Sequence, residues 1–183
     1  MKIEVRLSGS GGQGVILAGI ILAEAAGIHD GKNVVQTQSY GVEARGGASR
    51  SEIIISDEEI VFPEVIVPDI LVGLNQASIL RYAGNLRKEG MLIADSTNVG
   101  EIPGTGARVA RVPMTTLAER SGGRILTNIV ALGVLVGLTG VCSEAAIHRA
   151  VSTRVPPGTE RVNLGALELG LGAGGQMEKW VKG

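Results

Sequence analysis

The stretch LSGSGGQGVILAG, residues 7–19, carries five glycines between two apolar segments. Before it, Ile3, Val5 and Leu7 alternate with charged residues, which predicts a strand with one less buried face. After it, residues 12–28 are almost free of charge and end near Gly27, which predicts a largely buried helix. A strand, a glycine turn and a helix in this order indicate an α/β domain.

The glycine turn has the spacing of a phosphate-binding loop. Gly9, Gly11 and Gly14 fit G-x-G-x-x-G, and backbone N–H groups at the start of the following helix would face a diphosphate. A dinucleotide site also needs a carboxylate at the end of the second strand. That strand, expected at 33–38, ends in Gln38 and Ser39, so classical NAD binding is disfavoured. A purely structural role, close packing of strand and helix, remains the alternative.

The middle of the chain predicts further strands. A polar, glycine-rich loop at 39–50 precedes apolar runs at 52–56 and 58–62, and Ser56-Asp57 between them suggests a hairpin, so that part of the sheet is antiparallel. After Pro68, a strand (69–75), a helix (76–88) and a strand (90–96) read as a parallel βαβ unit. The remaining elements are expected as a strand at 107–113 and helices at about 114–121, 125–139, 143–153 and 160–171.

These elements predict a Rossmann-like three-layer αβα domain. Its sheet is mostly parallel with some antiparallel pairing, and the C-terminal third is helical. The length of 183 residues suits a single domain spanning 1–183.

Composition excludes several classes of function. With 17 basic and 18 acidic residues and no basic run, the chain does not suit nucleic acid. The most apolar stretch, 125–141, is too short and too interrupted to span a membrane, and the N-terminus lacks a secretory signal, so a cytoplasmic location is expected. One cysteine, Cys142, cannot ligate an iron–sulfur cluster or form an intramolecular disulfide.

A second glycine-bearing loop, Tyr40–Gly47, follows the second strand and should leave the same sheet edge as the first loop. Within and beside it, Arg45 and Arg50 could bind a phosphate or carboxylate, and Tyr40 could stack on a ring. The alternative is a pair of surface ion pairs, Arg45 with Glu43 and Arg50 with Glu52, each contributing under about 1 kcal/mol.

The other polar residues predict no catalytic group and no metal site. His29 and His148 lack partners at metal-ligand spacing, and Ser10 is not in a nucleophile elbow. Cys142 is expected to be buried, and Asp95 at a strand end is expected to cap a turn. A chain with a binding crevice and no group of reactive side chains suggests a subunit that contributes to the active site of another subunit.

The pair of motifs GSGGQG (9–14) and YGVEARGG (40–47) resembles the gamma subunit, or gamma domain, of the 2-oxoacid:ferredoxin oxidoreductases. Pro68-Asp69, the segment 93–95 and Asn128 before a long apolar helix also resemble this family. The resemblance associates this domain with coenzyme A. It implies a coenzyme A contact at Gly9, Gly11, Gly12, Gln13, Gly14, Tyr40, Gly41, Glu43, Arg45, Gly46 and Gly47.

The resemblance further implies CoA-dependent oxidative decarboxylation of a 2-oxoacid to acyl-CoA, with electrons passing to ferredoxin. Thiamine diphosphate would belong to alpha and beta subunits, and iron–sulfur clusters to beta and a ferredoxin-like delta subunit, so the isolated chain should bind no cofactor alone and be inactive. The 3′-phosphate of coenzyme A would also explain the missing ribose carboxylate, since Arg45 or Arg50 would attract it.

Among substrates, 2-oxoglutarate is the first choice for a separate gamma chain. The alternatives are a non-catalytic scaffold subunit, the small subunit of an indolepyruvate oxidoreductase and a free-standing nucleotide-binding oxidoreductase. The missing acidic residue argues against the last of these.

Overall fold

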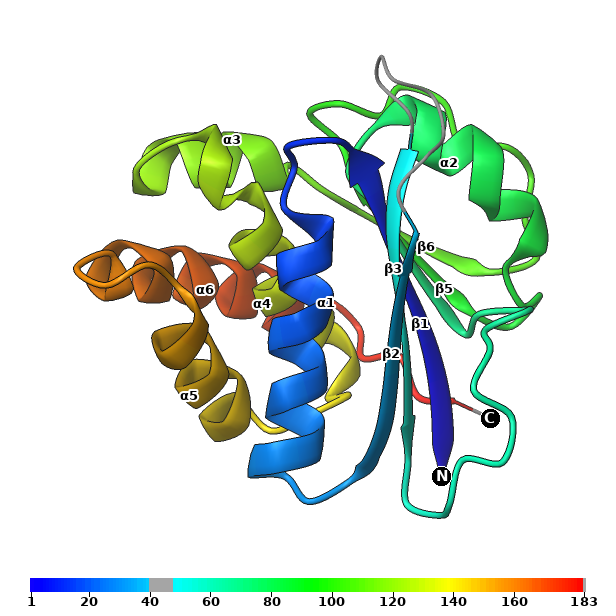
Figure 1. Cartoon of the computed structure of the whole chain (residues 1–183). Helices are drawn as coiled ribbons and strands as arrows, with labels where there is room; N and C mark the ends of the chain where they lie inside the picture. The colour runs from blue at the N-terminus through cyan, green and yellow to red at the C-terminus, as the bar shows by residue number, and fades with distance from the viewer. Residues whose placement is uncertain (40–47, 183) are drawn as a thin grey trace.

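A computed structural model describes residues 1–39 and 48–182 of the chain, and within them one six-stranded sheet has the order β2-β3-β1-β4-β5-β6. The strands are β1 (Lys2–Ser10), β2 (Asn33–Ser39), β3 (Ala48–Ser56), β4 (Ile70–Gly73), β5 (Met91–Asp95) and β6 (Arg108–Val112). Strands β1, β4, β5 and β6 are parallel neighbours, whereas β3 is antiparallel to both β1 and β2. The predicted mixed, mostly parallel sheet is therefore confirmed (Figure 1).

The antiparallel pairing arises at a different place from the predicted one. The expected hairpin of 52–56 with 58–62 is wrong: β3 begins at Ala48, near the end of the expected loop 39–50, and pairs with β2 from Asn33↔Ser56 to Ser39↔Arg50. Residues 58–62 form no strand, and Val61 is 90% exposed. An isolated strand is unstable because no neighbouring element covers its apolar side chains. The apolar residues of 58–62 are therefore not enough to make this segment a strand.

Strand β1 lies between β3 and β4 and is buried on both faces over most of its length, whereas one face was predicted to be less buried. The charged side chain that suggested exposure, Arg6, is 3% exposed because its guanidinium donates to Glu52 and to the Val65 carbonyl. The guanidinium also stacks over the ring of Tyr82, 5.2 Å from its centroid. A buried charge persists only with such partners, and the partner on β3 is 46 residues away in sequence.

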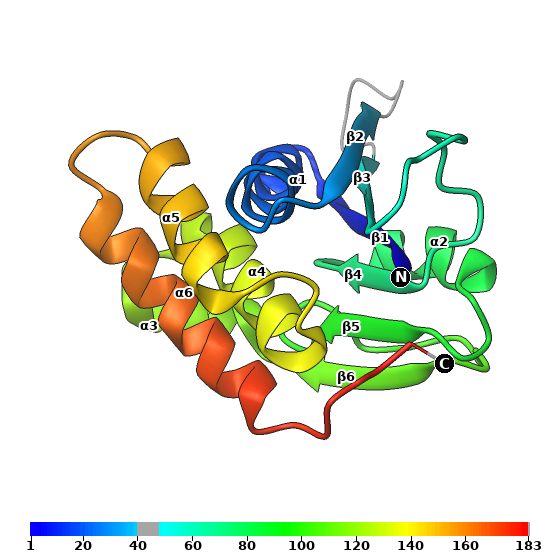
Figure 2. The same ribbon diagram turned by 90° about the horizontal axis from the view of Figure 1, so that it is seen from below.

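Helices cover the two sheet faces unequally. Helix α2 (Gln76–Tyr82) lies on one side, and the other side carries α1 (Val15–Glu24), α3 (Met114–Ser121), α4 (Thr127–Thr139), α5 (Glu144–Arg154) and α6 (Glu160–Gly175), as Figures 1 and 2 show. The predicted helical C-terminal third is confirmed, with α3 at its expected residues. Two expected helices are shorter: α1 continues as a π-helical turn (Ala25–His29), and α2 as a 3-10 turn (Ala83–Asn85).

Helices α4 and α6 run parallel in direct backbone contact. A Cβ on Gly133 would lie 2.4 Å from the Leu167 carbonyl oxygen, and one on Gly137 would lie 2.6 Å from the Leu171 carbonyl oxygen. From the other side, Gly170 and Gly174 approach the Val130 and Val134 carbonyl oxygens in the same way. Only glycine permits this approach, so the apolar helix α4, buried almost throughout, lies at a fixed distance from α6.

The C-terminal segment returns from α6 to the sheet (Figure 2). Trp180 is 3% exposed, its backbone N–H donates to the Leu138 carbonyl, and its indole N–H donates to the Glu89 carbonyl. Lys182 pairs with the fully buried Asp69. Within the described residues, no helix combines the length and the apolar character needed to cross a membrane.

Candidate functional site

The glycine loop connects β1 to α1 at the carboxyl end of the sheet. Gly12 and Gly14 have φ values of 86° and 70°, a left-handed conformation that favours glycine, and Gly14 is the N-cap of α1. A Cβ on Gly14 would lie 2.5 Å from the amide nitrogen of Asn128, which donates to the Gly14 carbonyl at 3.2 Å. The predicted strand, glycine turn and helix therefore stand as expected, and the turn packs tightly on α4.

Gln13 closes the loop from inside. Its Oε1 accepts from the backbone N–H of Ser10 at 2.7 Å, the Ser10 hydroxyl at 2.9 Å and the Asn75 amide at 3.0 Å, while its Nε2 donates to the Leu74 carbonyl at 3.3 Å. Ser10 ends β1 and Leu74 follows β4, so the side chain bridges the ends of two neighbouring parallel strands. Open α/β sheets bind dinucleotides in a crevice at the topological switch point, where the loops leave neighbouring strands in opposite directions. Gln13 bridges two such loops here.

This bridge was not predicted from the sequence. Asn75 also caps α2, because its Oδ1 accepts from the Ser78 backbone N–H at 2.8 Å. An Asn before a helical segment is a recognisable cap signal, but its second bond, to a residue 62 positions earlier, has no local signature.

The second predicted loop, Tyr40–Gly47, lies outside the described residues, and so do its candidates Tyr40, Gly41, Glu43, Arg45, Gly46 and Gly47. Its two neighbouring strands are described. Ser39 pairs with Arg50, and Arg50 pairs with Ser8, so β2 ends and β3 begins at the same sheet edge as the glycine loop. Strand β2 ends with Gln38 and Ser39, so its last two residues carry no carboxylate.

Arg50 lies beside the buried ion pair of the sheet face opposite α1. Its Nε is 3.8 Å from Glu52 Oε2, and its guanidinium is 5.9 Å from the centroid of the Tyr82 ring. The predicted Arg50–Glu52 pair therefore exists as a long contact. Glu52 accepts a shorter hydrogen bond from Arg6, whose Nε lies 2.7 Å from Oε1, so Glu52 is only a distant partner for Arg50.

A pocket of about 380 Å³ opens beside the glycine loop on the side of α1 and α4. Three helices begin at its wall: Gly14 is the N-cap of α1, Leu126 of α4 and Thr159 of α6. The complete lining is Gly12, Gly14, Leu17, Gly122, Ile125, Leu126, Asn128, Val155, Pro156, Thr159, Val162 and Asn163. Of these residues only Gly12, Gly14 and Asn128 could be singled out from the sequence, because the connections α3–α4 and α5–α6 meet the glycine loop only in the folded chain.

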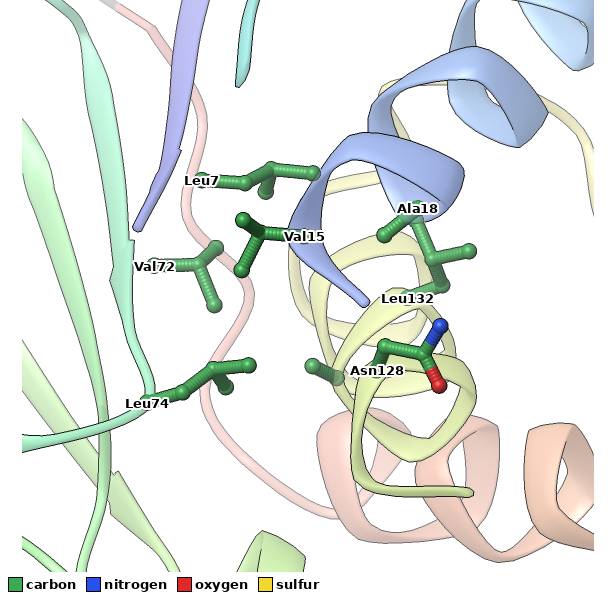
Figure 3. A pocket seen from close by; sticks show the side chains of 8 residues that line it. Leu7, Val15, Ala18, Val72, Leu74, Asn128 and Leu132 are labelled. Carbon is green, nitrogen blue, oxygen red and sulfur yellow. The ribbon is translucent and has the colours of Figure 1, made fainter. Parts of the chain in front are cut away.

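A second, much smaller cavity lies beneath the loop. It measures about 10 Å³, the space of a single water molecule at most, so it is a packing void rather than a ligand site. Figure 3 shows its walls, where strand and helix side chains face one another: Leu7, Val15, Ala18, Val72, Leu74, Asn128 and Leu132.

The remaining candidates behave as structural residues. Asp95 is fully buried and accepts from the Thr97 N–H, the Asn98 amide and Thr115, which confirms the predicted cap. Cys142 is buried, and its burial, together with the charge of Asp30, raises the pKa of its thiol to about 12. A thiol of this pKa is protonated and unreactive at neutral pH.

The two histidines lie on the helical side. His148 contacts Glu168, whereas His29 is 3.7 Å from the buried Glu24, which also binds Arg154. In the part of the chain that the structure describes, no three His, Cys, Asp or Glu side chains are grouped to hold a metal ion.

The fold and the loop define a Rossmann-like α/β domain whose glycine turn is occupied by its own glutamine. Residues 4–173 match the family of pyruvate ferredoxin/flavodoxin oxidoreductases, and the chain belongs to this family. It is 47% identical, over 93% of this chain and 92% of the relative, to a 2-oxoglutarate synthase subunit KorC of Methanocaldococcus jannaschii. The resemblance inferred from the two glycine motifs is thereby confirmed.

Solved structures agree with this assignment. The gamma subunit of a keto/oxoacid ferredoxin oxidoreductase from Geobacter sulfurreducens is 43% identical with a TM-score of 0.87, covering 96% of this chain and 99% of that one. A 2-oxoglutarate:ferredoxin oxidoreductase from Magnetococcus marinus, solved with 2-oxoglutarate, coenzyme A and succinyl-CoA, shares the fold at 21% identity and a TM-score of 0.88. The match covers 98% of this chain but 32% of that longer one.

Proposed function

We propose that this chain is the gamma subunit of a 2-oxoglutarate:ferredoxin oxidoreductase and contributes to coenzyme A binding. The observation that carries the proposal is the 47% identity to a 2-oxoglutarate synthase subunit over nearly the whole of both chains. The complex would convert a 2-oxoacid and coenzyme A to acyl-CoA and carbon dioxide, and pass two electrons to ferredoxin in the cytoplasm.

The chemistry of decarboxylation belongs to the partners in this proposal. Thiamine diphosphate and the iron–sulfur clusters would be held by alpha, beta and ferredoxin-like delta subunits, because a chain with one cysteine cannot ligate a cluster. That cysteine is buried with a pKa of about 12, so it also does not supply a nucleophile. The gamma chain would bind and orient coenzyme A.

Two features of the described residues fit a coenzyme A contact. The backbone of Gly12 and Gly14 faces a pocket at the start of α1, where the helix dipole favours electron-rich groups. The end of β2 and the start of β3, which flank the segment 40–47 in sequence, lie at the same sheet edge as the glycine loop. Gln13 is a support in this proposal, because its amide is engaged inside the loop, whereas Arg45 is the candidate for the 3′-phosphate.

Reconstitution tests the proposal. The tagged chain, expressed with the other subunits of its own complex under anaerobic conditions, should copurify with a thiamine-diphosphate subunit and a cysteine-rich subunit. The complex should reduce ferredoxin with 2-oxoglutarate only when coenzyme A is present. Recovery of the chain without such partners would contradict the subunit assignment. Faster turnover with pyruvate, 2-oxoisovalerate or indolepyruvate would contradict the substrate.

Charge removal separates the coenzyme A role from the scaffold alternative. In the assembled complex, Arg45→Ala should raise the KM for coenzyme A about ten-fold, the loss of one charge-assisted hydrogen bond, and leave the KM for 2-oxoglutarate unchanged. The control is Arg149→Ala, an exposed arginine on α5. Unchanged kinetics in Arg45→Ala would favour the scaffold reading. Micromolar NAD binding to the isolated chain by calorimetry would favour the free-standing nucleotide-binding reading.

A further inference from the structure

The β3–β4 connection, residues 57–69, exposes a group of large apolar side chains. Val61, Phe62, Ile66 and Val67 all lie within this short segment, and each is between 42% and 90% exposed. Single apolar residues scattered over a protein surface are normal. A contiguous group of them with polar residues around it instead marks an interaction site.

The backbone that carries these side chains is held to the sheet. Val65, a buried residue between the exposed ones, accepts a hydrogen bond through its carbonyl from the guanidinium of Arg6 at 3.1 Å. At the end of the connection, the Asp69 N–H donates to the Glu4 carbonyl at 2.8 Å, and the Glu4 N–H donates to the Asp69 carboxylate at 2.9 Å. The apolar side chains are therefore presented to solvent on an anchored backbone, and a partner that covered them would remove apolar surface from water.

A groove of about 320 Å³ lies beside the exposed apolar side chains. Its lining residues are Glu4, Phe62, Glu64, Ile66, Val67 and Arg87. Protein interfaces are commonly anchored by a side chain of one partner that fills a hollow of the other. The groove gives the β3–β4 connection a hollow of this kind, with apolar residues on its wall.

The charges of the connection indicate the chemistry of its partner. Residues 57–67 contain four acidic residues and no basic one. Asp57 is neutralised by ion pairs within the chain. The other three, Glu58, Glu59 and Glu64, are exposed, and among the described residues no Lys or Arg pairs with them. A surface with an apolar centre and Lys or Arg side chains around it would complement this segment.

The same charges disfavour a second copy of this chain as the partner. A two-fold symmetric contact joins the same patch of both chains. A dimer formed through the β3–β4 connection would therefore bring Glu58, Glu59 and Glu64 of one copy close to those of the other. Like charges opposed across an interface repel each other, so a different chain with basic residues is the better fit.

Both ends of the described chain lie beside the connection (Figure 1). The ammonium group of Met1 is 2.7 Å from Asp57 at one flank, and Lys182 is 2.7 Å from Asp69 at the other. The fold of this chain covers only 32% of the longer Magnetococcus marinus chain. The rest of such a chain continues from one or both ends of this domain. It therefore begins next to the exposed apolar side chains.

We propose, on the basis of the function proposed above, that the β3–β4 connection is the docking surface for another subunit of the complex, the one that corresponds to the rest of that longer chain. The partner presents apolar side chains to Phe62 and Ile66, and Lys or Arg side chains to the three unpaired glutamates. This surface is separate from the glycine loop, because its two flanks meet the start of β1 and the glycine loop follows the end of β1.

A photocrosslinking amino acid tests the contact directly. In the purified complex, benzoylphenylalanine in place of the exposed Phe62 should crosslink to the partner subunit on irradiation. Mass spectrometry should locate the crosslink in an apolar stretch that has Lys or Arg residues beside it. The control is the same amino acid in place of Leu169, an exposed leucine of α6 on the other side of the sheet, which should not crosslink to that subunit.

Two double variants test which forces hold the partner. Val61→Ser with Ile66→Ser removes exposed apolar surface, and it should raise at least about ten-fold the concentration at which this chain dissociates from the complex on dilution. Glu58→Lys with Glu59→Lys should act in the same direction, and more strongly at low than at high salt. All four positions are exposed, so the variants should fold.

The matched control removes the same kind of surface elsewhere. Ile28 and Leu169 are exposed apolar residues on the helical side of the sheet. Ile28→Ser with Leu169→Ser should leave the dissociation of this chain from the complex unchanged.

Three results would overturn the inference and leave the proposed function standing. The first is a complex that turns over 2-oxoglutarate but gives no crosslink from the Phe62 position and keeps its affinity in both double variants. The second is a crosslink from that position to a second copy of this chain. The third is equal weakening by the control pair. A wild-type chain that recovers no partner subunits would instead contradict the proposed function itself.

Discussion

At the scale of single residues, Gln13 explains why a loop with dinucleotide-type spacing need not bind a dinucleotide. The sequence showed the glycines and the missing ribose carboxylate, both of which are local. It did not show that the intervening glutamine would bind Ser10 and the segment after β4, because hydrogen bonds between residues 61 or 62 positions apart depend on which strands become neighbours. The glycine spacing therefore predicted the shape of the loop but not that the Gln13 side chain bridges the ends of β1 and β4.

Gln13→Ala should destabilise the protein. The substitution leaves the Ser10 N–H and the Asn75 amide without their acceptor, and an unsatisfied polar group of this kind costs about 1–3 kcal/mol. The free energy of unfolding in urea measures the effect. The control is Gln176→Ala, at an exposed glutamine after α6. Equal stability of the two variants would show that water replaces the Gln13 bonds without cost.

His148 gives a pH-dependent contact between α5 and α6. Partial burial of the ring lowers its pKa, but hydrogen bonds to the Glu144 carbonyl and Glu168, and the negative charge of both glutamates, outweigh this and raise the pKa above 6.5. A group with a raised pKa contributes stability below its unfolded value and loses it as the pH rises through the folded value.

Glu168→Gln should therefore lower the His148 pKa, measured by NMR titration of the ring protons. It should also reduce the loss of stability that the wild type shows as the pH rises above about 6.5. An unchanged titration would mean that the backbone carbonyl alone holds the imidazolium.

At the scale of elements, the parallel pair α4–α6 depends on glycine at four positions. The apolar composition of α4 predicted a buried helix. The face that meets α6 could not be predicted, since nearly every position of α4 is buried and an all-apolar helix has no polar face to orient it. The error at 58–62 has another cause: no neighbouring strand pairs with this segment in the described sheet, and pairing depends on residues distant in sequence.

Gly137→Ala should destabilise the fold, because the new methyl group would lie 2.6 Å from the Leu171 carbonyl oxygen and force the helices apart. Overpacking of this kind costs about 1–3 kcal/mol. Gly172→Ala on α6 is the matched control, since its Cβ would have no neighbour within 4 Å among the described residues. The control should be neutral or more stable by up to about 1 kcal/mol, the helix propensity of alanine. Thermal unfolding compares the two, and similar losses in both would contradict the contact.

At the scale of the whole molecule, Trp180 joins the helical layer to the sheet. It is the single tryptophan of the chain and donates to carbonyls of Leu138 and Glu89, which lie at the end of α4 and before β5. Its fluorescence should therefore report the unfolding of both layers. We expect the urea transition followed by fluorescence to coincide with that followed by circular dichroism. An earlier fluorescence transition would show that the C-terminal segment detaches by itself.

The single antiparallel strand β3 has a consequence for the order of folding. Only eight residues of sequence separate β2 from β3, whereas β1 and β4 pair Val5 with Ile70. Loop-closure entropy grows by about 0.6 kcal/mol per doubling of length, so the local hairpin forms at about 2 kcal/mol less entropic cost than the central parallel pairing. If a helical crossover joined β2 to β3 instead, β1 would lack an early-formed hairpin to pair with. During synthesis, β2 and β3 can thus present a paired edge to β1 before β4 has left the ribosome.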